Sequence, residues 1–154
     1  MQKWIYYVIQ WTWGIVMNLI GAMIFIAIIA ANGVCAIVKH RSLFHIYKYR
    51  NAICMVVPWN CGGVSFGMFF VRGKNKESIC SHEYGHGIQN LWWGPLFLFV
   101  IAIPSVTRYF WRKFYRTFIY PKNRKKLPPY DSIWFEGQAT NLGQQAENNK
   151  WRWL

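Results

Sequence analysis

The first quarter of the chain is one long apolar stretch. No charged residue lies between Lys3 and Lys39, and about 20 apolar residues suffice to cross the hydrocarbon core of a bilayer. Trp and Tyr residues gather where the stretch begins, and their amphipathic rings suit the boundary between lipid and water. The pattern predicts a transmembrane helix over residues 4–38. Asn18 interrupts the apolar pattern near its middle, and we expect it to bond to a neighbouring helix.

The pattern changes between residues 39 and 76. Residues 39–50 are basic and amphipathic, which is typical of a segment at the membrane surface. Two β-prone runs follow at residues 53–57 and 64–71, and Pro and Gly residues mark a turn between them. The predicted structure is a short β-hairpin. A re-entrant membrane segment is the alternative, because the two runs and their turn carry no charge.

Helical patterns return in the second half of the chain. Residues 77–106 are predicted to form a helix with a kinked apolar continuation, since Gly94-Pro95 disfavours a straight helix. Residues 107–154 are predicted to form a basic interfacial helix and a final helix. We therefore expect a single, mainly α, membrane-embedded domain over residues 1–154. Its parts are two apolar helical segments, interfacial helices and a short β-hairpin.

The composition favours a membrane protein over a soluble one. Hydrophobic residues make up 54% of the 154 residues and aromatic residues 19%, more than a soluble chain of this length can bury. The formal net charge is +13. Because the basic residues flank apolar segments and no nucleic-acid-binding motif is present, we expect anionic lipid headgroups as partners and no nucleic acid.

The four cysteines form no C-x-x-C pair, which argues against a structural zinc site of the finger type. Cys54 and Cys61 are open to two interpretations, a disulfide or buried free thiols.

One motif carries recognisable chemistry, His82-Glu83-Tyr84-Gly85-His86. Histidines four residues apart on a helix point from the same face, so His82 and His86 can reach one zinc ion. Glu83 then lies where it can take a proton from the attacking water, as a general base does. The alternative is two helix histidines in ordinary hydrogen bonds.

A catalytic zinc ion usually has a third protein ligand. The carboxylates after the motif are Asp131, Glu136 and Glu147. Glu136 is the favoured ligand, because it lies among apolar neighbours where an unpaired charge is costly. Asp131 is the rival ligand, and pairing of Glu136 with a Lys or Arg residue is the alternative to ligation.

The motif and the later run Glu136-Gly137-Gln138-Ala139-Thr140 resemble the gluzincin membrane peptidases, the group of the CAAX prenyl protease and its bacterial heat-shock relative. In that family the third ligand opens an E-x-x-A-D pattern, so the resemblance gives Glu136 this role and places Thr140 where the family has Asp. Residues 82–105 and the pattern E-x-x-A-x-x-L-G at residues 136–143 also resemble a group of small bacterial membrane proteins. Site-2 intramembrane proteases share the HExGH form but use an Asp ligand, for which Asp131 is the candidate.

Two further residues are candidates for orienting the ligands. Gln89 follows His86 by three residues and shares its helix face, although a contact within the helical core is an equally good interpretation. Thr140 is the second candidate, from its place in the resemblance.

These observations predict an integral zinc-dependent endopeptidase of a bacterial cell membrane, with Zn²⁺ as cofactor. Its substrate would be a membrane-associated peptide or protein, and residues 64–71 are a candidate edge strand for binding it. A homo-oligomer or a larger membrane complex is left open. The alternative function is a non-catalytic membrane protein or complex subunit that uses the HExxH site for metal binding or structure.

Overall fold

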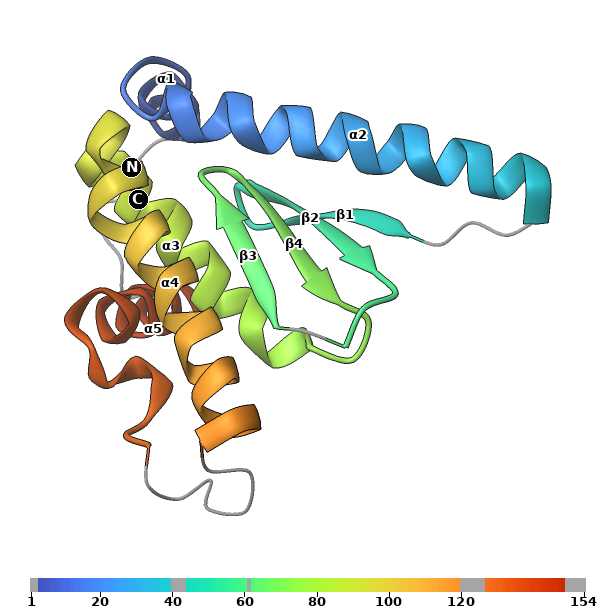
Figure 1. Ribbon diagram of the computed structural model, residues 1–154. Coiled ribbons are helices and arrows are strands. Elements are labelled where there is room, and N and C mark those ends of the chain that lie inside the picture. Colours follow the sequence, from blue (N-terminus) through green and yellow to red (C-terminus); the bar gives the residue numbers. More distant parts are fainter. Residues whose placement is uncertain (1–2, 40–43, 61, 120–126, 149–154) are drawn as a thin grey trace.

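The computed structural model describes residues 3–39, 44–60, 62–119 and 127–148. It is mostly helical and contains one small sheet, which confirms the predicted mainly α fold with a small β element. Three helices, α3 to α5, gather beside the sheet, and the long helix α2 runs past its other side (Figure 1).

The N-terminal apolar stretch forms two helices, α1 (Lys3–Thr12) and α2 (Ile15–Lys39). The sequence predicted a single helix here, and the break falls at Gly14. A side chain from elsewhere in the chain binds at this point: Asn90 Nδ2 donates to the Gly14 carbonyl at 3.2 Å and to Gln10 Oε1 at 2.8 Å. A partner so distant in sequence leaves no trace in local hydrophobic periodicity, which is why the break was missed.

Four short strands form one mixed sheet in the order β1-β2-β4-β3. Their bounds are His45–Tyr49 for β1, Ala52–Val57 for β2, Gly63–Phe66 for β3 and Phe69–Gly73 for β4. The predicted single hairpin is wrong, because residues 64–71 themselves turn back at Gly67, whose φ is 68°. As a result β3 and β4 pair antiparallel, whereas β4 pairs with β2 in the parallel sense.

Both faces of the sheet are covered. Successive side chains of a strand point to opposite faces: Cys54 of β2 packs with Tyr84 and Ile88 on one side, and Met55 packs with Phe25 of α2 on the other. Strands buried on both faces are apolar throughout. The two covered faces therefore explain why residues 53–71 carry no charge, which was the reason for considering a re-entrant membrane segment.

Asn18 of α2 is buried and fully engaged. Its Nδ2 donates to the main-chain carbonyl and the Oε1 of Gln10 in α1, which confirms the expected bond to a neighbouring helix. Its Oδ1 also accepts the Met68 N–H at 2.8 Å. One side chain thus ties α1 and α2 to the turn between β3 and β4.

The HExxH motif lies on α3 (Cys80–Trp93), which follows the 3₁₀ turn η1 (Glu77–Ile79). The predicted kink after it is confirmed: Gly94 has a φ of 51°, and the helical segments before and after this region are bent by 119°. The chain then stays helical past Pro104, so the second apolar segment and the basic interfacial helix are one continuous element. η2 (Gly94–Leu96) lies before the bend, and the element after it consists of η3 (Leu98–Ala102), α4 (Ile103–Phe114) and η4 (Tyr115–Ile119). This element, residues 98–119, is called the α4 region below.

The last helix, α5 (Trp134–Glu147), packs directly against α3. Two glycines permit this close crossing. A Cβ atom at Gly85 would collide with the Ala139 carbonyl, and one at Gly143 would collide with the Ser81 carbonyl. The glycine contacts bring the first turns of α5 over the HExxH face of α3.

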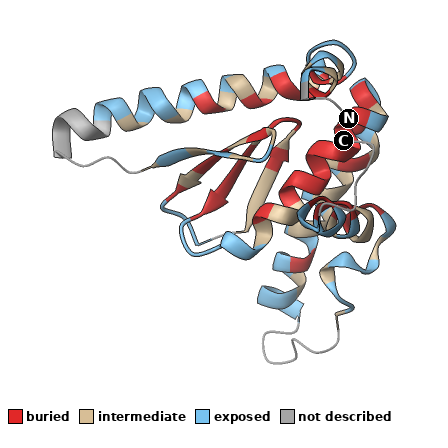
Figure 2. Ribbon diagram, turned by 180° about the vertical axis from the view of Figure 1, so that it is seen from behind, coloured by how far each residue is buried: buried red, intermediate tan, exposed pale blue. Residues whose placement is uncertain are grey.

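Much apolar surface stays outside the core. Within the described residues, Ile15–Val34 of α2 is the one helix long and apolar enough to cross a membrane, and the bent pair of α3 and α4 adds a second crossing if it is counted as one broken span. Only 22% of the most apolar window of α2 is buried. In Figure 2 exposed residues, coloured pale blue, recur along this helix.

Candidate metal centre

Three side chains from two helices converge on one point. The Nε2 atoms of His82 and His86 lie 3.1 Å and 3.3 Å from the same oxygen, Oε2 of Glu136. The two histidines are one turn apart on α3, and Glu136 lies in the first turn of α5. Among the described residues this is the one group of three or more metal-ligating side chains close enough to hold an ion.

The spacing of these atoms fits a bound metal ion. Ligands about 2.0–2.1 Å from a tetrahedral zinc ion lie roughly 3.3 Å from one another, close to the two separations around Glu136 Oε2. The donor set of two imidazole nitrogens and one carboxylate oxygen is one that zinc accepts. Glu136 is fully buried, and its partners at Oε2 are these two imidazoles. The group can therefore hold a metal ion without rearrangement of the helices.

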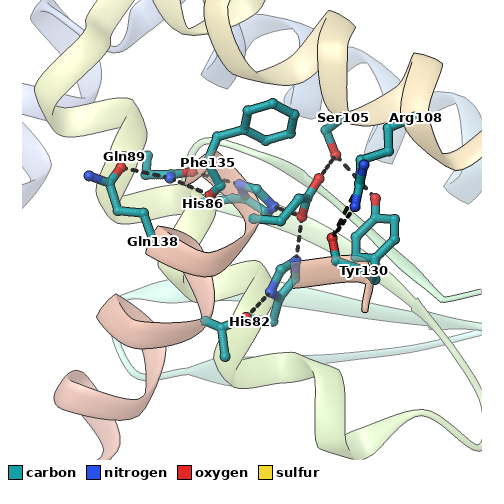
Figure 3. A network of polar contacts seen from close by, with 10 residues as sticks. His82, His86, Gln89, Ser105, Arg108, Tyr130, Phe135 and Gln138 are labelled. Carbon is teal, nitrogen blue, oxygen red and sulfur yellow. Dashed lines mark hydrogen bonds and ion pairs between the residues drawn. The ribbon is translucent and has the colours of Figure 1, made fainter. Parts of the chain in front are cut away.

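Gln89 fixes the orientation of His86. Its Oε1 lies 2.7 Å from His86 Nδ1, and its Nε2 donates to the Phe135 carbonyl at 2.8 Å and to Gln138 Oε1 at 2.9 Å (Figure 3). A carbonyl can only accept, so the amide nitrogen of Gln89 must face Phe135 and its oxygen must face His86. His86 then carries its proton on Nδ1, which leaves the Nε2 lone pair directed at the site.

Thr140 has the same relation to His82. The Thr140 Oγ1 atom lies 3.0 Å from His82 Nδ1, and Thr140 follows Glu136 by four residues on the same face of α5. The two residues singled out as orienting candidates thus each contact a different ligand histidine at its outer nitrogen. In this position the Thr140 hydroxyl can accept a hydrogen bond from the Nδ1–H group of His82, which leaves Nε2 of His82 free to ligate.

The carboxylate of Glu136 is held at both oxygens. Ser105 of α4 donates a short hydrogen bond to Oε1, while Oε2 faces the histidines. Burial alone raises the pKa of this carboxyl, but its contacts with His82, His86 and Ser105 outweigh burial and hold its pKa far below the usual range. Glu136 is therefore an anion at neutral pH, as a metal ligand must be.

Glu83 lies beside this group. Its side chain is buried, and a Cβ atom at Gly63 of β3 would lie 2.7 Å from its Oε1. Burial raises the pKa of Glu83 to about 8, opposed by the nearby His82 and reinforced by the negative charge of Glu136. An acid tuned close to neutrality can both accept and return a proton.

Sequence reasoning missed several residues that hold the site together. Besides Ser105, the Tyr130 hydroxyl lies 3.4 Å from Ser105 Oγ, and burial raises the pKa of Tyr130 to about 12. Arg108 and Arg112 of α4 donate to main-chain carbonyls between Pro128 and Tyr130. Ser105 could have been found, because Pro104 and Ser105 end the stretch that resembles the small bacterial membrane proteins. Nothing in the sequence pointed to Tyr130, Arg108 or Arg112.

The other carboxylates lie elsewhere. Asp131 is exposed and is not part of the converging group, and Glu147 accepts a hydrogen bond from Tyr49 at 2.7 Å. Of the two candidate third ligands, the structure brings Glu136 to the histidines. Cys54 and Cys80 are free, buried thiols, and Cys61 lies outside the described residues.

The three ligands differ in their exposure to solvent. The His82 side chain is 20% exposed, compared with 7% for His86 and none for Glu136. A surface hollow between Trp92 and Gln145 is lined by residues 131–133 and by other residues of α5, and it does not include the three ligands. His82 is therefore the ligand most accessible to solvent.

Comparison of the chain with protein-family models, curated proteins and solved structures found no match.

Proposed function

We propose that this chain is a zinc-dependent hydrolase that cleaves peptide bonds in membrane-associated peptides or proteins. One observation carries the proposal: Glu83, His82 and His86 share α3, and the buried Glu136 of α5 meets both histidines at a single oxygen. The resemblance of the motif to gluzincin membrane peptidases supports the same assignment.

Zinc is the ion that best suits this donor set, since it binds imidazole nitrogen and carboxylate oxygen in compact tetrahedral sites. When bound, it supplies Lewis acidity, which lowers the pKa of water to about 7 and polarises a carbonyl group. His82, His86 and Glu136 would hold the ion. Gln89 and Thr140 would keep the two imidazoles in the required orientation.

Glu83 is the proposed proton carrier. It takes a proton from the attacking water and later gives it to the nitrogen of the leaving amine. Its neighbour Gly63 leaves its carboxylate room that a larger residue would fill.

Strand β3 supports a peptide as the substrate. It is an outer strand of the sheet, paired within the sheet with β4 alone, and it packs beside α3. An extended peptide can add to such an edge through main-chain hydrogen bonds. Because Gly63 of β3 lies against Glu83, a peptide bound there passes beside the general base.

The apolar surface supports a location in a membrane. α2 is long enough to cross a bilayer, and the outer face of the α4 region (residues 98–119) carries an exposed stripe at helical spacing. Its members are Phe99, Ile103, Val106, Phe110 and Phe114. The opposite face of this region supplies Ser105 to the metal group. A site held by a lipid-facing helix favours substrates that are themselves in or near the membrane.

The test is Glu83→Gln, with Glu77→Gln as the matched control, because Glu77 is an exposed carboxylate on the preceding turn. Each purified protein is loaded with zinc and assayed on fluorescein-labelled casein in detergent. We expect Glu83→Gln to lose at least about 100-fold in kcat and to keep its zinc, while Glu77→Gln behaves as the wild type. Unchanged cleavage by Glu83→Gln would refute the assigned role. Zinc binding without cleavage in any of the proteins would favour the non-catalytic alternative.

A further inference from the structure

Tyr130 lies next to the metal group. Its ring centroid is 6.4 Å from that of His82, the most exposed of the three ligands. Its hydroxyl is 3.4 Å from Ser105 Oγ, and Ser105 in turn bonds to the Glu136 carboxylate. Tyr130 therefore lies beside the most exposed ligand of the group (Figure 3).

Two arginines hold this tyrosine in place. The guanidinium carbons of Arg108 and Arg112 lie 5.8 Å and 5.7 Å from the Tyr130 ring centroid. Arg108 also donates to the Tyr130 carbonyl at 3.1 Å and 3.2 Å. Arg112 is buried and donates to the Pro128 carbonyl at 2.8 Å.

The contacts of the two arginines with Tyr130 are not needed to position Glu136. Glu136 lies six residues later, inside α5, and its own carboxylate is already fixed by Ser105 and the histidines. Burial of a guanidinium is costly unless its donors are used. The two cations and their carbonyl bonds thus fix the position of a ring and its hydroxyl, which points to a function for the hydroxyl itself.

The Tyr130 hydroxyl is a hydrogen-bond donor that lies near both Ser105 and the Glu136 carboxylate. Ser105 has one hydroxyl proton, and it is donated to Glu136 Oε1, so Tyr130 must be the donor in their mutual contact. At 3.4 Å that contact is long, and hydrogen bonds weaken as they lengthen. Exchange of this weak bond for one to an anionic oxygen is favourable.

We propose that Tyr130 is a catalytic residue that donates a hydrogen bond to the carbonyl oxygen of the scissile peptide bond. The inference rests on the proposed hydrolase function. As the water oxygen attacks the carbonyl carbon, the carbonyl electron pair moves to this oxygen, and the Tyr130 O–H bond stays intact while it stabilises the charge. When the pair returns, the C–N bond breaks and Glu83 passes its proton to the nitrogen. A donor that acts on developing charge raises kcat more than it changes substrate affinity.

The experiment compares wild type, Tyr130→Phe and Tyr49→Phe. Phenylalanine keeps the ring between the arginines and removes only the hydroxyl, and Tyr49 is a matched control because its hydroxyl bonds to Glu147, away from the site. Three quantities are measured in detergent: zinc affinity, binding of a phosphinic pseudotripeptide with Phe side chains to the zinc-loaded protein, and cleavage of fluorescein-labelled casein.

We expect Tyr130→Phe to bind zinc as the wild type does but to lose about 100–1,000-fold in kcat, with KM nearly unchanged and much weaker phosphinate binding. Tyr49→Phe should match the wild type in all three. If Tyr130→Phe binds the phosphinate and cleaves casein like the wild type, the role of Tyr130 is refuted and the hydrolase proposal stands. If the wild type binds zinc but neither binds the phosphinate nor cleaves casein, the hydrolase proposal itself fails, and the role of Tyr130 with it.

Discussion

Glu136 is the residue on which the chemistry of the site depends. It is a fully buried carboxylate that meets two imidazoles at one oxygen and a serine hydroxyl at the other. An isolated buried carboxylate is strongly unfavourable, so its position is explained by what it binds. Contacts with two imidazoles compensate its charge only partly, and a divalent cation held between the three ligand atoms would compensate it fully.

Gln89 gives a prediction at this scale. Gln89→Met keeps the volume of a fully buried side chain but removes the acceptor that holds the Nδ1 proton of His86. We expect zinc affinity to fall by about 10–100-fold, measured by competition with a chromogenic chelator. The exposed residue Gln145 gives the control, Gln145→Met, which should bind zinc as the wild type does. Equal affinity in the two variants would mean that His86 needs no such partner.

The residues of the site were predictable to different degrees. His82, Glu83 and His86 could be found because helix geometry alone places side chains four residues apart on one face. The choice of Glu136 depended on its apolar neighbours, which indicate burial. Tyr130 and its arginines could not be found, since their roles arise from a contact between α4 and the segment before α5, and sequence spacing carries no information about it.

At the level of secondary structure, the contact that assembles the metal group is the crossing of α3 and α5. Gly85 lies against Ala139 and Gly143 against Ser81, each so closely that a side chain would collide with main chain. Glycine is a costly choice inside a helix, by about 1 kcal/mol relative to alanine. The cost is offset because the closer approach lets Glu136 reach the histidines.

Gly143→Ala tests this contact. The added methyl group forces the helices apart at Ser81, and we expect a loss of about 1–3 kcal/mol in the free energy of unfolding together with weaker zinc binding. The control is Gly33→Ala in α2, where an added Cβ meets nothing within 4 Å. The control variant should be as stable as the wild type or slightly more so. Thermal unfolding in detergent compares the two, and full zinc affinity in Gly143→Ala would contradict this account of the crossing.

Helices were easier to predict here than strand pairing. The long apolar and amphipathic runs indicated α2, α3 and α5 because a helix satisfies its main chain locally. The pairing of β4 with β2 in the parallel sense joins segments separated by β3, and the predicted hairpin assumed that neighbouring runs pair with each other. The turn at Gly67 was hidden inside a run that read as one strand.

At the scale of the whole molecule, the polar site lies between apolar outer surfaces. α2 and the α4 region expose large apolar side chains on their outer faces, while their inner faces supply Asn18 to the core network and Ser105 to the metal group. Exposed apolar patches of this kind mark contact with a membrane or another protein. This arrangement supports the proposed insertion into a bilayer.

The membrane assignment predicts the behaviour of a variant with charges on α2. Met23 and Ile26 are 61% and 66% exposed, so Met23→Lys combined with Ile26→Lys leaves internal packing intact. Each lysine near the centre of a span costs about 2.5–3.5 kcal/mol of insertion. We expect a large part of this variant to be released from membranes by alkaline carbonate, while Gln144→Lys on α5 stays with the membrane fraction. Equal retention of both would argue against a span at α2.

The metal content of the purified protein tests the central claim most directly. Wild type, Glu136→Ala and Asp131→Ala are purified in detergent, supplied with zinc, dialysed and analysed by mass spectrometry of the metal. We predict about one zinc ion per chain in the wild type and in Asp131→Ala, and none in Glu136→Ala. A wild type that holds no zinc after loading, or a Glu136→Ala variant that keeps its zinc while Asp131→Ala loses it, would contradict the site described here.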